Sequence, residues 1–115
     1  MNKMEALKRR KWESKKWLDE ATTEFREYEN TKKGIKLAHA GEKLWNAFIL
    51  YLDGSRKERT SYKDIKDVSM KDPFAKNIFN DAYWLHIFYY RGYSDDLRIE
   101  EEKFRNVRDK LKGVI

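Results

Sequence analysis

Cysteine and glutamine are absent from this chain of 115 residues, and only one proline and five glycines interrupt it. Without cysteine the chain forms no disulfide, no thiolate metal site and no cysteine nucleophile. Its two histidines supply few nitrogen ligands for a metal centre. No apolar run approaches the roughly 18 residues of a membrane span, and the charged N-terminus lacks the apolar stretch of a signal peptide. We therefore expect a cytoplasmic protein with no metal, no cofactor and no membrane partner.

The scarcity of proline and glycine leaves long uninterrupted segments in which apolar residues recur at intervals of three and four. This periodicity is typical of helices and disfavours strands. A chain of this length supports one hydrophobic core. The sequence therefore predicts an all-α fold, in which four long helices and one short helix form a single up-down bundle domain over residues 1–115.

Capping and stop signals predict where these helices begin and end. We expect helices at 3–28, 31–53, 61–68 and 73–91, and a last helix that begins after residue 94. The residues expected to cap or end them are Asn30, Thr31, Gly54, Ser61, Asp72 and Ser94. The second helix has the widest apolar arc, so we expect it to lie at the centre with Trp45 in the core.

The first and last helices each carry one apolar stripe, which should face this core. In the first helix the expected stripe is interrupted at Lys11 and Ser14. Its members are Met4, Leu7, Leu18, Ala21, Phe25 and Tyr28. In the last helix the expected stripe consists of Leu97, Phe104, Val107, Leu111 and Val114.

Residues 80–93 form the most aromatic stretch, with six rings among fourteen residues around a single His86. Helical geometry spreads these rings over several faces, because Trp84 and Phe88 lie on a different side from Tyr89. A bundle of this size cannot readily bury every face, so a partner is expected to cover at least one of them. A homodimer interface is our leading interpretation, and contact with another helix and partial exposure are the alternatives.

His86 lies at the edge of the apolar stripe of its helix. We interpret it as a core histidine hydrogen-bonded to a neighbour; the alternative is a functional site to which Tyr89 and Arg91 also belong. Helical geometry places Arg91, five positions after His86, on a different face. These two residues therefore make a poor catalytic pair. The other histidine, His39, is expected to be a solvated surface residue.

Charged residues make up 40% of the chain, a composition typical of thermophilic proteins that use ion-pair networks. The net charge is +6, and positions 1–16 contain seven Lys or Arg residues against two Glu residues. A ring flanked by cations can stack on a base while the cations hold phosphates. The candidate nucleic-acid contacts are Lys8, Trp12, Lys15 and Lys16 on one flank of this arm, and Arg56, Lys57 and Arg59 in a later loop. The alternative for the arm is an ordinary solvated helix face.

Two short blocks carry a resemblance to a known family. Residues 40–47, AGEKLWNA, look like a pattern of Ala, Glu, Lys, aromatic and Ala, and residues 85–90, LHIFYY, are similar to a Leu-His-x-x-Phe-Tyr pattern in which Tyr89 replaces Phe. With the order of the helices, these blocks resemble the PaREP family of small archaeal helical proteins, itself similar to the HEPN helical bundles. The resemblance implies a HEPN-like bundle that acts as a binding or assembly module, as the partner of a nucleotidyltransferase or of RNA.

A metal-independent RNase of the HEPN type is the alternative function that the resemblance implies. HEPN relatives that cut RNA carry an arginine and then a histidine with four to six residues between them, so that a guanidinium holds phosphate while an imidazole moves protons. No arginine precedes His86 or His39 at that spacing. We therefore expect a binding protein and not an enzyme, with no catalytic residue to assign.

Overall fold

The computed structural model describes residues 2–53, 62–91 and 96–115, and over these ranges it is all-helical. The helices are α1 (Lys3–Thr31), α2 (Gly34–Asp53), α3 (Tyr62–Lys71), α4 (Pro73–Arg91) and α5 (Arg98–Lys112). The predicted all-α class is confirmed. None of these described helices combines the length and the apolar character that crossing a membrane requires.

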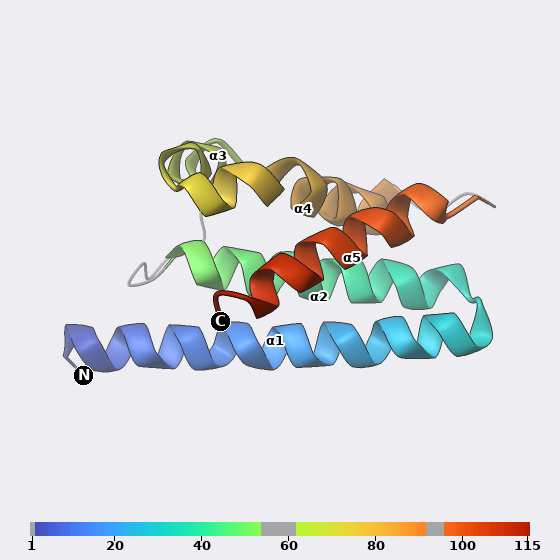
Figure 1. Cartoon of the computed structure of the whole chain (residues 1–115), viewed down its shortest axis with the longest axis horizontal. Coiled ribbons are helices and arrows are strands. Elements are labelled where there is room, and N and C mark those ends of the chain that lie inside the picture. The colour runs from blue at the N-terminus through green and yellow to red at the C-terminus, as the bar shows by residue number, and fades with distance from the viewer. Residues whose placement is uncertain (1, 54–61, 92–95) are drawn as a thin grey trace.

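α2 lies at the centre of the molecule, as its wide apolar arc predicts. It runs antiparallel to α1 along its whole length, while α4 packs on its other side and α5 crosses it (Figure 1). α3 packs beside α4. Trp45 is only 4% exposed, which confirms its placement in the core. The core also contains the fully buried side chains of Phe25, Leu37, Leu44, Phe48, Ile78, Phe79, Leu85, Phe88, Phe104 and Leu111.

The turn between α1 and α2 differs from the prediction. α1 continues to Thr31, and Lys32 takes the left-handed conformation expected of Asn30, with φ 57° and its N–H donated to the carbonyl of Tyr28 at 2.6 Å. Thr31 does not cap α2, because it is the last residue of α1: its hydroxyl donates to the carbonyl of Glu27 and accepts from the N–H of Lys33, which precedes α2. Asparagine favours the end of a helix but does not impose it. Here α1 ends where the chain must reverse direction so that α2 can pack against it.

The apolar stripe of α1 begins later than predicted. Leu18, Ala21, Phe25 and Tyr28 are buried, but Met4 is 67% exposed, and the side chain of Leu7 lies outside the described residues. The reason is length: α1 has 29 residues and α2 has 20, so the first turns of α1 project past the end of α2 (Figure 1). A projecting turn has no neighbouring helix on which to bury an apolar side chain.

Ser14 is the first of the described side chains of α1 to be fully buried. It is 1% exposed, and its hydroxyl donates a hydrogen bond of 2.7 Å to the carbonyl of Ala47 in α2. This polar residue interrupts the apolar pattern but does not interrupt the helix contact, because its only donor is satisfied across the interface.

The remaining helix starts follow the local signals with small differences. Asp72 caps α4 as predicted, since its Oδ1 accepts from the N–H groups of Phe74 at 2.9 Å and Ala75 at 3.3 Å. α3 extends to Lys71, three residues beyond the predicted end, and the expected cap Ser61 lies outside the described residues. Gly54 and Ser94 also lie outside them.

α5 begins at Arg98, whose N–H donates to Asp96 at 3.1 Å. Its buried stripe is shorter than predicted. Phe104, Val107 and Leu111 are buried, whereas Val114 is 39% exposed because the helix has ended at Lys112.

Candidate functional site at the contact of α2 and α4

The two sequence blocks that carry the family resemblance meet where α2 and α4 touch. Gly41 in α2 lies against Leu85 in α4, and a Cβ atom placed on Gly41 would stand only 3.3 Å from the Cβ of Leu85. This contact is tighter than an ordinary van der Waals contact, so a side chain at this position would require Leu85 to shift, and glycine favours the close approach. This approach brings the next residue of α2, Glu42, to the next residue of α4, His86.

Glu42 and His86 form a carboxylate–imidazole pair. Oε1 of Glu42 lies 2.8 Å from Nδ1 of His86, and the two side chains are 18% and 25% exposed. On its other side the His86 ring stacks on Trp45, with the centroids 5.0 Å apart and the planes 23° apart. His86 is therefore half-buried at the edge of the core, with one nitrogen held by a carboxylate and the ring oriented by an indole. A carboxylate hydrogen-bonded to Nδ1 fixes the orientation of the ring. The other ring nitrogen, Nε2, is then the one that can exchange a proton with a bound molecule.

Aromatic rings continue from His86 in both directions along the surface. We define the aromatic strip as Tyr62, Tyr83, His86, Tyr90, Tyr89 and His39. Adjacent centroids along it are 4.5 Å apart for Tyr62 and Tyr83, 6.1 Å for Tyr83 and His86, 5.0 Å for His86 and Tyr90, 5.0 Å for Tyr90 and Tyr89, and 5.9 Å for Tyr89 and His39. Tyr90 is 70% exposed and Tyr89 38%. The strip therefore passes from the core edge out into solvent.

Arg91 does not belong to this strip. Its guanidinium carbon lies 5.4 Å from the ring centroid of Trp84, which is also approached by the Lys103 ammonium at 4.9 Å. The Trp84 indole N–H donates to Glu100 in α5 at 2.8 Å. Of the three residues predicted to share a site, His86 and Tyr89 therefore lie along one strip, whereas Arg91 lies with Trp84 and α5.

The N-terminal arm forms a second, separate surface. Trp12 is 63% exposed, and the ammonium of Lys16 lies 5.6 Å from its ring centroid. A shallow depression beside this ring is lined by Trp12, Lys15, Lys16, Asp19 and Glu20. Lys8 is exposed one turn before Trp12. The structure therefore gathers Trp12, Lys15 and Lys16, with two acidic residues among the neighbours.

The loop residues Arg56, Lys57 and Arg59, which were predicted to add positive charge, lie outside the described residues. Within the described part of the chain, no group of three histidine or acidic side chains is arranged to hold a metal ion.

Sequence reasoning missed Glu42 as the partner of His86. The signal was present, because Glu42 stands three positions before Trp45 and so shares its helix face. It also missed the contact of His39 with Tyr89. Comparison with known proteins finds no matching family model, no matching curated protein and no matching solved structure.

Proposed function

We propose that this protein is a non-catalytic binding and assembly module that pairs with a second copy of itself through the aromatic strip. The observation that carries this proposal is that the rings of Tyr90 and Tyr89 are exposed. They are connected to the core by ring contacts through His86 and Trp45. Tyrosines of this kind supply large contact area at a low cost in side-chain entropy, and they are enriched at protein interfaces. A two-fold axis on the strip would place the same rings opposite each other.

Charge favours a second copy on this face over the other exposed face. The N-terminal arm carries seven Lys or Arg residues against two Glu residues, so two copies of that arm would repel each other. Beside the aromatic strip, the carboxylate of Glu42 is already paired with His86. A second copy could therefore cover the rings of the strip without burying an unpaired carboxylate. A stable interface of this kind covers about 800 Å² on each partner.

The HEPN-like form of the bundle, membership of the PaREP family and a nucleotidyltransferase partner belong to the same proposal. Their support is the resemblance of residues 40–47 and 85–90. A thermophilic and cytoplasmic setting likewise rests on composition, since 40% of the residues are charged and cysteine is absent.

The size of the particle in solution tests the assembly proposal. Light scattering should give about twice the chain mass of 14.0 kDa, and the double substitution of Tyr89 and Tyr90 by Glu should shift it to the monomer. Trp12→Ala is the matched control, because it removes another highly exposed ring outside the strip. A wild-type protein that remains monomeric at every concentration would refute the proposal.

RNA binding by the N-terminal arm is a second candidate function, favoured by the exposed Trp12 ring with Lys16 beside it. Affinity for single-stranded RNA should then fall linearly with salt on logarithmic axes. Reversal of Lys8, Lys15 and Lys16 to Glu should abolish binding while helix content is retained. Binding that is independent of salt, or unchanged in this variant, would reject the candidate.

The RNase alternative has one observation in its favour, the pair of Glu42 and His86, because an imidazole oriented by a carboxylate can transfer protons. Arg91 lies over Trp84 and is not placed to hold a phosphate beside His86. We therefore propose binding in preference to cleavage. Incubation of labelled RNA with the wild-type protein and with His86→Ala separates the two, since only an RNase loses activity on this substitution.

A further inference from the structure

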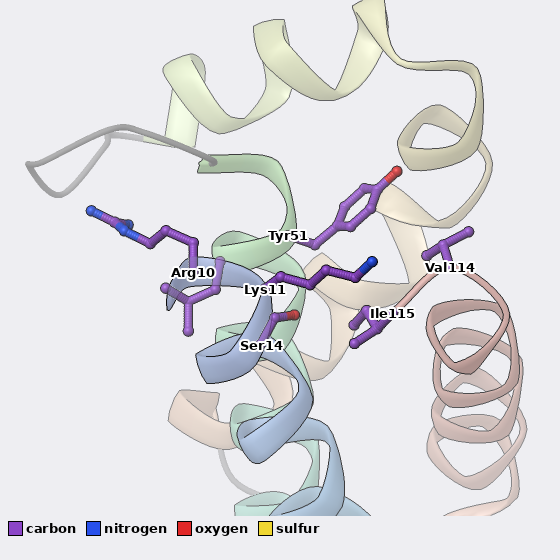
Figure 2. Close-up of a pocket in the computed structure, with 7 residues that line it drawn as sticks. Arg10, Lys11, Ser14, Tyr51, Val114 and Ile115 are labelled. Atoms are coloured by element: carbon purple, nitrogen blue, oxygen red, sulfur yellow. The ribbon is translucent and has the colours of Figure 1, made fainter. Parts of the chain in front are cut away.

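A cleft is formed by three segments that are distant in sequence: α1, the last turns of α2 and the residues that follow α5. It is lined by Arg10, Lys11 and Ser14 of α1, Leu50 and Tyr51 of α2, and Val114 and Ile115 after α5, and its volume is about 250 Å³ (Figure 2). The residues after α5 are held in place by the N–H groups of Val114 and Ile115, which donate to the carbonyl of Leu111 at 3.1 Å and 3.0 Å. The cleft wall is therefore part of the fold.

Most of this wall is apolar and uncharged. Leu50, Val114 and Ile115 contribute aliphatic surface, and the ring of Tyr51 is fixed by an edge contact with Phe74 at 5.3 Å. Burial, assisted by the neighbouring Asp72, raises the pKa of Tyr51, so its hydroxyl stays neutral. The hydroxyl proton of Ser14 is already donated to Ala47. An apolar molecular body can therefore lie in the cleft without leaving a wall donor unsatisfied.

Among the described side chains that line the cleft, the charged one that enters it is Lys11. Its ammonium end extends toward Tyr51 and Ile115, whereas Arg10 points away from them (Figure 2). Among the described residues Lys11 has no hydrogen-bond or ion-pair partner. The surrounding arm has a strong positive excess, which adds to the attraction for an anion. An ammonium beside apolar walls is suited to hold an anion.

We propose that this cleft binds a small organic carboxylate, with the carboxylate paired to the Lys11 ammonium and a compact apolar body, such as a phenyl ring, against Leu50, Tyr51 and Ile115. The volume lies just below the usual range for ligand sites, about 300 to 1,000 Å³, and so selects a small molecule. A single entering cation matches the single charge of a carboxylate and not the several charges of a nucleotide. The site is independent of the aromatic strip and of any self-association.

Backbone amide shifts in a titration with sodium benzoate test this site. Saturable shifts should concentrate on Ser14, Leu50, Tyr51, Val114 and Ile115. The neutral isostere benzamide and the small anion acetate should each bind about tenfold more weakly, because one lacks the charge and the other lacks the apolar body. This comparison uses the wild-type protein and does not depend on any variant folding.

Lys11→Met is the direct variant, and it should weaken benzoate binding about tenfold while leaving benzamide binding unchanged. Lys76→Met is the matched control, because it removes an exposed lysine of α4 that does not line the cleft. Benzamide and benzoate shifts of equal strength, full binding by Lys11→Met, or benzoate shifts that never saturate would each overturn the proposal.

Discussion

Replacement of Trp45 by Ala is the sharpest test of how the core supports the candidate site. Trp45 is 4% exposed, and its ring centroid lies 5.7 Å from Phe48, 6.4 Å from Phe79, 5.8 Å from Tyr83 and 5.0 Å from His86. The indole therefore joins the ring cluster of the core to the imidazole of the aromatic strip. Its removal should affect both stability and the position of His86.

The magnitude follows from the cavity that the substitution leaves. Truncation of a fully buried tryptophan or phenylalanine typically costs about 3–5 kcal/mol, because the surrounding side chains relax only in part. A domain of this size has a total unfolding free energy of about 5–15 kcal/mol, so the loss is a large fraction of it. At about 4 °C per kcal/mol, the melting temperature should fall by about 12–20 °C.

Urea denaturation followed by far-UV circular dichroism measures the free energy of unfolding. Trp12→Ala is the control within the same chain, because Trp12 is 63% exposed and its removal should change stability by no more than about 0.5 kcal/mol. The His86 imidazole signals should move in Trp45→Ala and stay in place in Trp12→Ala. A loss below about 1 kcal/mol for Trp45→Ala would show that the indole is not a core residue and would refute the reasoning.

Three further predictions follow from single contacts. Asp72→Ala removes the cap of α4 and should lower the free energy of unfolding by about 0.5–2 kcal/mol in urea denaturation, whereas Asp72→Asn should retain most of it. Ser14→Ala removes the hydrogen bond to Ala47 and should cost about 1 kcal/mol in the same assay; no loss would mean that this buried bond contributes nothing. Burial, together with the hydrogen bond to Glu101, raises the pKa of Tyr28 to about 12, so its stabilising contribution is complete below the unfolded-state pKa of about 10 and is lost as the pH rises toward 12. Tyr28→Phe should remove this part of the pH dependence, and an equally steep loss of stability between about pH 10 and 12 in both proteins would contradict it.

Signals that act within one helical turn predicted much of the fold. Asp72 and Pro73 identified the start of α4, because a side-chain oxygen followed by a residue without an N–H is suited to a helix start wherever the helix packs. The wide apolar arc of residues 34–53 identified α2 as the central helix and placed Trp45 in the core. The sequence also placed Trp12 among lysines on one flank of the N-terminal arm, and Trp12 is exposed there. These features depend on a few neighbouring residues, so the sequence alone determined them.

Features that depend on how helices meet could not be predicted in this way. Among the described residues no helix lies beside the first turns of α1, because α2 is shorter, and Met4 is exposed there. Glu42 and His86 are 44 positions apart, and they meet because Gly41 lets α2 approach Leu85 closely. The shared helix face of Glu42 and Trp45 is visible in the sequence, but the approach of His86 to that face is not.

The cleft beside Lys11 is likewise a product of tertiary structure, since its walls come from both ends of the chain and from α2. Capping and amphipathic patterns have a range of about four residues, whereas a site is set by the distance and angle at which distant helices pack. The sequence alone therefore determined which elements form and which face each one buries. Only the packing of α2 against α1, α4 and the end of α5 decided which side chains share a site.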